Sequence, residues 1–361
     1  MLGEALLSHG AEVLFYDPDP DAPALRRFAR GTTGAWDDPA ALRAFAERVD
    51  VLTYEFENVE PTPLRGLTTP VLPGLDVLAV TQHRAREKSF CATHALPHPR
   101  FEIADGEADI LARGARLGVP LVAKTTRGGY DGKGQRSART TDELHDAAHT
   151  LRDAGPVVLE ELVPFVCEVS VITARDRQGR TATFPVLENA HVGGVLDTTL
   201  TPARVGDDVE AEARRIATRA AELLGVVGLL TTELFVTAEG RVLVNEFAPR
   251  PHNSGHVTRA ATTASQFDVL ARILLDMPMG SIQPLPGHWA MANLLGDLWQ
   301  ARRRPELDWA ALDAEGLVEL CLYGKQEARA GRKMGHLSVV APTPEDALQR
   351  AREARRRLGA P

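Results

Sequence analysis

The sequence predicts a protein of the α/β and α+β classes, in which an open parallel α/β domain precedes a larger mixed domain and a small mixed β domain. Over about the first 75 residues, short apolar runs alternate with segments of helical spacing, which is typical of a mostly parallel sheet. The central region holds longer apolar runs and a strong hairpin pattern at residues 228–247. A proline-rich linker at residues 283–287 precedes the last part of the chain.

These patterns divide the chain into three expected domains, at residues 1–80, 81–282 and 283–361, with a glycine-rich subdomain at about residues 118–165 of the second. A polar helix is expected at residues 81–94, at the start of the second domain. The chain should end in a helix, because Thr343 is placed as its N-cap, with a proline and two acidic residues directly after it.

Composition excludes several function classes. The chain has 361 residues, of which 44% are hydrophobic and 25% charged, and its net charge is −8. These are the values of an ordinary globular protein, and the negative charge argues against a nucleic-acid partner. Three well-separated cysteines indicate reduced thiols rather than a metal or redox motif. No apolar run is long enough to span a membrane and no signal peptide opens the chain, so we expect a cytoplasmic protein.

The hairpin at residues 228–247 carries the strongest signal. A tight turn at Glu239–Gly240 would join two apolar strands. A two-residue loop there pairs Glu233 directly with Glu246, on one face of the sheet with Cβ atoms roughly 5 Å apart.

Two carboxylates placed in this way repel each other, so a cation is expected between them. With the neighbouring Asn245, Glu233 and Glu246 are suited to a hard divalent ion such as Mg²⁺, with Mn²⁺ as an alternative, holding nucleotide phosphates. The competing interpretation is that one glutamate is exposed, protonated or paired with Arg250.

A glycine-rich loop lies between two predicted strands at residues 122–135. It matches neither of the common phosphate-loop motifs, and no helix follows it closely. Its backbone N–H groups could still fold over phosphates, with Lys124 on the incoming strand adding a positive charge. An ordinary hairpin tip is the alternative.

The lysine-bearing strand, the glycine loop and the paired glutamates, in this order, resemble the ATP-grasp superfamily. Three separated motifs, at residues 127–135, 245–256 and 331–336, narrow the resemblance to the N5-carboxyaminoimidazole ribonucleotide synthase family. The resemblance covers essentially the whole chain. It implies an ATP-grasp fold for the central domain, with the other two domains on either side.

The resemblance also implies a nucleotide site. Arg84 and Lys124 would contact the ATP phosphates, and Glu233 and Glu246 would bind Mg²⁺. The remaining expected nucleotide contacts are the lid residues Gly129, Tyr130, Asp131, Gly132, Lys133, Gly134 and Gln135, the adenine hinge Glu160, Glu161, Leu162 and Val163, the ribose ligand Glu168, and His191, Asn245 and Glu246. Without the family, Arg84 would read as a surface charge, Glu160 and Glu161 as solvated residues and His191 as a structural histidine.

The implied reaction is the carboxylation of aminoimidazole ribonucleotide with bicarbonate and ATP. Bicarbonate would attack the γ-phosphorus, and the resulting carboxyphosphate, or CO₂ released from it, would meet the substrate amine beneath a closed lid. The ribonucleotide would be bound by Glu57, Tyr130, Lys133, Arg332 and Lys333. The catalytic residues would be Arg250, His252, Asn253 and Lys333. The family also suggests a homodimer.

Two features depart from the family pattern. The strand and glycine-rich turn that normally precede the first helix are missing, so we expect the natural protein to begin about 10–15 residues upstream. His83 stands where the family usually has aspartate. The missing turn matters because it would bring backbone amides to the substrate phosphate.

Other functions remain open at the level of sequence. A formate-dependent glycinamide ribonucleotide transformylase carries a similar run around Arg250, but its pattern differs after the histidine. A non-catalytic nucleotide-binding regulator is the alternative from another class. A carrier-dependent carboxylase is disfavoured because the chain has no Met-Lys-Met biotinyl site.

Overall fold

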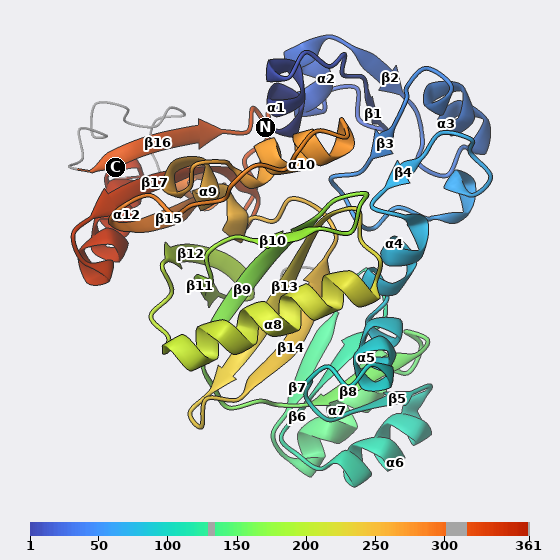
Figure 1. The fold of residues 1–361 in the computed structure, drawn as a ribbon. Helices are drawn as coiled ribbons and strands as arrows, with labels where there is room; N and C mark the ends of the chain where they lie inside the picture. The colour runs from blue at the N-terminus through green and yellow to red at the C-terminus, as the bar shows by residue number, and fades with distance from the viewer. Residues whose placement is uncertain (129–133, 301–315, 360–361) are drawn as a thin grey trace.

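The computed structural model describes residues 1–128, 134–300 and 316–359 of the chain. Two antiparallel sheets dominate these residues, one of nine strands and one of four, and they face each other across the centre of the molecule (Figure 1). The α/β and α+β fold class is therefore confirmed.

The nine-stranded sheet runs through the central and C-terminal parts of the chain without interruption. Its strands, in spatial order, are β14 (Val242–Ala248), β13 (Gly228–Thr237), β9 (Phe165–Arg175), β11 (Leu187–Val192), β12 (Val195–Thr201), β15 (His288–Leu295), β17 (Lys333–Ala341) and β16 (Leu317–Leu322), with β10 (Thr181–Thr183) paired to β9. The last domain thus extends the same sheet as the central one.

Helices cover both faces of this sheet. Helix α8 (Asp207–Leu223) packs on one face, and α10 (Gln266–Leu274) packs on the other. Successive strand residues point to opposite faces, so Leu229 joins the core beneath α10 while Leu230 joins the core beneath α8. Burial on both faces explains why β13 begins as a continuous apolar run rather than an alternating one.

The four-stranded sheet has the order β5–β8–β6–β7. Its strands are β5 (Phe101–Ala104), β8 (Val157–Glu161), β6 (Leu121–Thr125) and β7 (Gln135–Ala138). Two amphipathic helices, α6 (Glu107–Leu117) and α7 (Thr141–Leu151), cover its outer face. No helix of this group covers the inner face, which carries Lys124 and faces the large sheet.

The N-terminal region is less regular than the sequence predicts. Its strands pair in parallel as expected, but they form two separate pairs, β1 with β2 and β3 with β4. Within residues 1–80 no strand lies between the pairs to join them into one open sheet. The elements here are α1 (Leu2–Ser8), β1 (Phe15–Asp17), α2 (Pro23–Phe28), β2 (Gly31–Thr33), α3 (Pro39–Ala46), β3 (Leu52–Thr53), the 3₁₀ helix η1 (Thr62–Leu64) and β4 (Val71–Leu72).

The helix expected at residues 81–94 is two helices in the structure. Helix α4 (Leu75–Thr81) ends before Gln82, and α5 (Arg84–Thr93) begins directly after His83, whose backbone is extended. The break places Arg84 at the N-terminus of α5, which lies beside the hairpin strand β14 (Figure 1).

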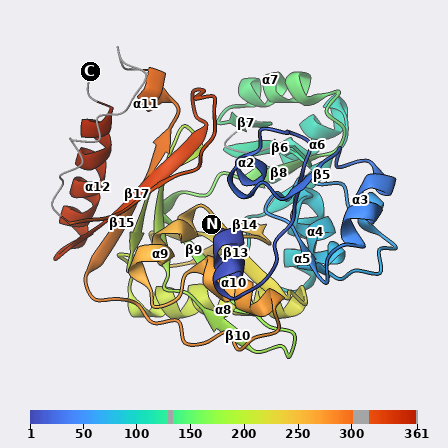
Figure 2. The same ribbon diagram turned by 90° about the horizontal axis from the view of Figure 1, so that it is seen from above.

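Short helices and α12 complete the chain. These are η2 (Ser254–Val257), α9 (Thr258–Ala261), α11 (Asp297–Gln300) and α12 (Pro344–Leu358). Helix α12 packs on β15 and β17, on the side of the molecule opposite α3 (Figure 2). In the part of the chain that the structure describes, no helix combines the length and the apolar character that a bilayer span requires.

The predicted N-cap of the last helix is confirmed, because the Thr343 hydroxyl accepts a hydrogen bond from the Asp346 N–H at 3.2 Å. We expect Thr343→Ala to lower stability by about 1 kcal/mol, since the first turn loses a partner for one N–H group. Urea unfolding measures the change, and Thr343→Ser, which keeps the hydroxyl, should unfold like the parent. Equal loss in both variants would show that the hydroxyl does not cap the helix.

Candidate active site

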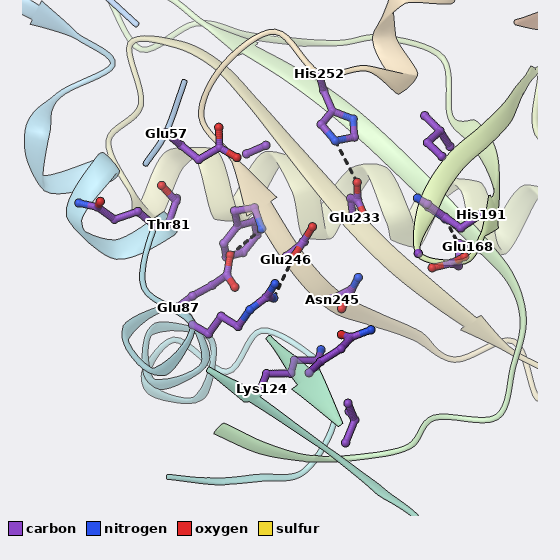
Figure 3. Close-up of a pocket in the computed structure, with 18 of the residues that line it drawn as sticks. Glu57, Thr81, Glu87, Lys124, Glu168, His191, Glu233, Asn245, Glu246 and His252 are labelled. Atoms are coloured by element: carbon purple, nitrogen blue, oxygen red, sulfur yellow. Dashed lines mark hydrogen bonds and ion pairs between the residues drawn. The ribbon is translucent and has the colours of Figure 1, made fainter. Parts of the chain in front are cut away.

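A cavity of about 360 Å³ lies between the two sheets (Figure 3). It is lined by side chains from all three parts of the chain. Among the residues predicted from sequence, the structure brings together Glu57, Arg84, Lys124, Gln135, Leu162, Glu168, His191, Glu233, Asn245, Glu246, Arg250, His252, Asn253 and Lys333. Glu57 and Lys333, which are 276 positions apart in the sequence, therefore line the same cavity.

The predicted pairing of Glu233 with Glu246 is confirmed, although the chain reaches it by another route. The connecting loop has three residues rather than two, since the Thr237 N–H donates to the Arg241 carbonyl and Gly240 adopts a φ of +76°. This loop alone would shift the register by one residue. A β-bulge at Asn245 shifts it back, so that Glu233 again faces Glu246.

The bulge also decides where the side chains point. In a regular strand, neighbouring side chains lie on opposite faces, yet Asn245 and Glu246 both line the cavity. Bulges redirect side chains in this way and often lie beside functional sites. The hairpin therefore presents two carboxylates and one amide to the same space.

Each carboxylate of the pair contacts a side chain of its own, a histidine for Glu233 and an arginine for Glu246. The Glu233 carboxylate lies 3.0 Å from His252 Nε2, and Arg84 donates to the Glu246 carboxylate at 3.0 Å (Figure 3). Although burial opposes it, the contact with His252 holds the pKa of Glu233 well below its ordinary value. Neither glutamate pairs with Arg250, so the pairing with Arg250 that the sequence left open is wrong.

The donor set fits a magnesium ion that shares its coordination with a nucleotide. Glu233 and Glu246 supply oxygen ligands, and Asn245 adds an amide oxygen beside them. Among the described residues no group of three or more His, Cys, Asp or Glu side chains forms a closed metal cage. Phosphate oxygens and water would therefore complete the shell, as is usual for Mg²⁺.

Beneath the cavity floor, Glu160 lies between two lysines. Its carboxylate is 3.2 Å from Lys124 Nζ and 3.3 Å from Lys88 Nζ, and the side chain is 1% exposed. Burial works against the charge, but the two ammonium groups lower the pKa of Glu160 to about 2. Burial in turn lowers the pKa of Lys124. Glu160 is therefore not solvated, and its side chain fixes the lysine that lines the cavity.

The segment predicted as an adenine hinge, residues 160–163, borders another part of the cavity. Leu162 lines the cavity there, next to the stacked rings of Phe165 and Phe235, whose centroids lie 4.8 Å apart. The N–H groups of Glu161 and Leu162 already donate to the carbonyls of Arg100 and Pro120. The apolar rings suit a flat base, while the roles of Glu160, Glu161 and Val163 in base contacts remain predictions.

A polar pair follows the hinge. His191 Nδ1 lies 2.9 Å from the Glu168 carboxylate, and both side chains line the cavity (Figure 3). Burial would lower the pKa of His191, but the hydrogen bond to Glu168 outweighs it and raises the pKa. The pair can thus present a partly charged imidazole beside a carboxylate, which suits hydroxyl and phosphate groups.

The far end of the cavity gathers the residues expected to bind the ribonucleotide and bicarbonate. Arg250 forms a two-pronged ion pair with Glu57. Both polar atoms of the Asn253 amide are buried without a hydrogen-bond partner among the described residues. Unpaired buried amide atoms are costly, and they indicate a ligand that would satisfy them.

The backbone of His252 is fixed from both sides. Gln266, which is fully buried, accepts from the His252 N–H at 2.9 Å and donates to its carbonyl at 2.7 Å. The imidazole is therefore aimed at Glu233 by a rigid support.

Some predicted residues are not part of this wall. Arg332 does not line the cavity, because its guanidinium turns to the Glu327 carbonyl at 2.8 Å. Gly134 lies at the base of the lid, where its carbonyl accepts from the Thr125 N–H. The remaining lid residues Gly129, Tyr130, Asp131, Gly132 and Lys133 lie outside the described part of the chain.

Sequence reasoning missed the contribution of Glu87 and Lys88. They follow Arg84 at positions i+3 and i+4, so the three lie on one face of α5. That spacing was a usable signal, since residues on the same helix face as the predicted phosphate ligand Arg84 are candidates to lie near the same site. Phe235 was also missed, although it lies two residues after Glu233 and thus on the same face of β13.

Comparison with known proteins defines the class of this site. Residues 89–267 match the model of the ATP-grasp domain, and residues 1–82 match that of the ribonucleotide synthetase pre-ATP-grasp domain. Residues 290–350 match the phosphoribosylaminoimidazole carboxylase C-terminal domain. The fold is thus that of an ATP-grasp protein.

Individual relatives narrow the class. The chain is 39% identical to the N5-carboxyaminoimidazole ribonucleotide synthase of Brucella melitensis, covering 95% of this chain and 93% of that protein. It superposes on the ADP complex of an N5-carboxyaminoimidazole ribonucleotide synthetase with a TM-score of 0.91 and 36% identity, covering 98% and 92% of the two chains. An Aspergillus clavatus enzyme in complex with ADP and 5-aminoimidazole ribonucleotide gives a TM-score of 0.87 and 26% identity, covering 98% and 94%. The chain belongs to the N5-carboxyaminoimidazole ribonucleotide synthase family.

The buried charge at the floor predicts a large and a small effect side by side. Glu160→Gln should destabilise the protein by about 3 kcal/mol at neutral pH, because two buried lysines lose their counter-charge. Glu161→Gln changes a more exposed pair with Arg100 and should cost less than about 1 kcal/mol.

The pH dependence gives this prediction a sign. The folded-state pKa of Glu160 is depressed to about 2 from an ordinary value of 4.5, so its stabilisation is complete above pH 4.5 and is lost as the pH falls toward 2. Urea unfolding at several pH values should show the difference between parent and Glu160→Gln shrinking over that window. A difference independent of pH would contradict the assignment of the charge.

Proposed function

We propose that this protein catalyses the ATP-dependent carboxylation of 5-aminoimidazole ribonucleotide with bicarbonate, giving N5-carboxyaminoimidazole ribonucleotide, ADP and phosphate in purine biosynthesis. The single observation that carries the proposal is the pair Glu233 and Glu246, opposed across a hairpin and facing Lys124 in one cavity. Family membership over nearly the whole chain supports the same reaction.

The chain's own residues would act first on the triphosphate. Phe165 and Phe235 offer an apolar surface to adenine, and Glu168 with His191 would meet the ribose and nearby phosphate. Lys124 and Arg84 would place positive charge on the phosphoryl oxygens, where charge is spread during phosphoryl transfer. Mg²⁺, when bound by Glu233 and Glu246, would neutralise part of that charge.

The opposite end of the cavity would hold the carbon acceptor and donor. Arg250, already oriented by Glu57, offers a planar fork that matches bicarbonate or a phosphorylated carboxylate. Asn253 and Lys333 would complete that oxyanion site. His252 lines the same cavity, and by its residue type it is our candidate to receive the proton of the substrate amine.

Three finer points belong to the same proposal. We propose Mg²⁺ as the resident metal, with Mn²⁺ as a substitute of similar oxygen preference. We propose a homodimer, which sedimentation would contradict if only monomer were seen. We also propose a cytoplasmic location, where the nucleotide substrates are available.

The alternatives are less well supported. Family membership does not favour the formate-dependent glycinamide ribonucleotide transformylase. A non-catalytic regulator is less well supported, because the relatives that the chain matches over most of its length are synthases.

Steady-state ADP release tests the function directly. We expect release with ATP, bicarbonate and 5-aminoimidazole ribonucleotide to exceed the rate without the ribonucleotide by at least about tenfold, with the carboxylated product detected by mass spectrometry. Formate with glycinamide ribonucleotide should give no stimulation. The proposed reaction would be rejected if only formate with glycinamide ribonucleotide stimulated ADP release. It would also be rejected if neither this pair nor bicarbonate with 5-aminoimidazole ribonucleotide did so.

The metal role of the hairpin has its own test. Glu246→Gln should lower ribonucleotide-dependent ADP release by about 100-fold or more, because a charged ligand for the phosphate-bound metal is lost. Glu239→Gln, at the turn of the same hairpin, should retain the parental rate. A mild effect of Glu246→Gln at saturating Mg²⁺ would argue that this carboxylate is not a ligand.

A further inference from the structure

Helix α5 contacts the hairpin through two buried side chains of ionisable type, and burial raises the pKa of one of them, Glu87, to about 8. Glu87 is 2% exposed and Lys88 is 1% exposed, which is rare for these residue types. Both share a face of α5 with Arg84, and this face contacts β14 through their side chains. Ionisable groups buried to this extent must have close partners, and here the partners include backbone groups of β14.

The contacts of Lys88 and Glu87 flank Glu246 on both sides. Lys88 Nζ donates to the carbonyl of Asn245 at 2.7 Å and to that of Val244 at 3.2 Å. The Glu87 carboxyl accepts from the Phe247 N–H at 2.6 Å. The residues before and after Glu246 are therefore tied to the same helix.

A bulged edge strand needs such support. β14 is the outermost strand at its end of the nine-stranded sheet, so only β13 pairs with one side of it. The bulge at Asn245 interrupts even that ladder, and interrupted backbone groups must find other partners when buried. Lys88 and Glu87 supply an ammonium group for the carbonyls and a carboxyl oxygen for the N–H.

Lys88 also connects the hairpin to the cavity floor. Its ammonium group lies 3.3 Å from the Glu160 carboxylate, which in turn lies 3.2 Å from Lys124 Nζ. The side chain that holds the bulge thus shares a counter-ion with the lysine that faces the phosphates. One buried network links the two walls of the cavity.

We propose that Lys88 and Glu87 are positioning residues that hold the Asn245 bulge in the one conformation that points both Asn245 and Glu246 at the metal. The proposal rests on the proposed function, since it assigns these residues to the same nucleotide and metal site. Neither residue touches the reacting atoms. Their effect would pass through the backbone of β14 and the carboxylate of Glu246.

A positioning role differs from a purely structural one in its dependence on metal. If the bulge relaxes, Glu246 returns toward the alternating geometry of a regular strand and leaves the cavity. Nucleotide binding without metal should then change little, while the gain in affinity from Mg²⁺ should fall. Partners that orient metal ligands typically contribute about 10–100-fold to metal affinity.

Calorimetric titration with the non-hydrolysable ATP analogue AMPPNP, in Mg²⁺ and in EDTA, measures this gain as a ratio of dissociation constants. Lys88→Met removes the ammonium group and keeps most of the apolar stem. We expect it to lower the ratio by about tenfold or more while the dissociation constant in EDTA stays within about twofold of the parent. Arg86→Met removes a positive charge from the exposed face of α5 and should leave the ratio unchanged.

A second pair of variants keeps the test decisive if Lys88→Met fails to fold. Glu87→Gln retains an acceptor for the Phe247 N–H and should keep the parental ratio. Glu87→Leu has no acceptor and should lower the ratio by about tenfold. Equal ratios in Glu87→Gln and Glu87→Leu, or a Lys88→Met protein with the parental ratio, would overturn the positioning role.

The same titrations separate this inference from the proposed reaction. A parent protein that gains affinity from Mg²⁺ but releases no ADP in response to the ribonucleotide would contradict the proposed reaction. The ratios of its variants would still test the positioning role of Lys88 and Glu87. A parent protein whose AMPPNP affinity is indifferent to Mg²⁺ would overturn that positioning role, whatever its turnover.

Discussion

Electrostatic repulsion between Glu233 and Glu246 is the constraint around which the site is built. Two carboxylates that face each other across neighbouring strands destabilise a sheet unless cations separate or neutralise them. In this structure His252 contacts the carboxylate of Glu233, and Arg84 contacts that of Glu246. We expect a metal ion bound between the acids to compete with both side chains for these carboxylates, which would couple metal binding to the arrangement of the rest of the cavity.

The surrounding fold can be understood as support for that pair. The nine-stranded sheet holds Glu233 within β13, between two layers of helices. Helix α5 and the four-stranded sheet meet beneath it through Glu160 and the two lysines. Because these residues come from a helix and two separate sheets, the geometry of the site depends on how these elements pack together.

Much of this arrangement could be predicted from sequence because it follows from local rules. The apolar runs around a glycine turn predict the hairpin. The pairing of Glu233 with Glu246 was predicted through a two-residue loop, whereas the structure reaches it through a three-residue loop and a bulge. The capped last helix follows from Thr343 and the residues after it. The assignment of Arg250, His252 and Asn253 required family resemblance, since isolated residues of these types carry no spacing signal.

Other features depend on tertiary structure and were missed or mistaken. The bulge at Asn245 lies where Lys88 of α5 donates to the Asn245 carbonyl, and nothing in the hairpin sequence alone reveals it. Arg332 was expected in the site from its motif, yet its side chain turns to a nearby backbone carbonyl. The four N-terminal strands alternate as a parallel sheet should, but their division into two pairs depends on which strands lie side by side.

The most direct test of the account is the position of the metal in crystals grown with Mn²⁺ and AMPPNP, measured by anomalous diffraction. The account predicts one strong peak within bonding distance of carboxylate oxygens from both Glu233 and Glu246, and of a phosphate oxygen. A nucleotide bound in the cavity while Glu246 remains on Arg84, with the metal elsewhere, would contradict it.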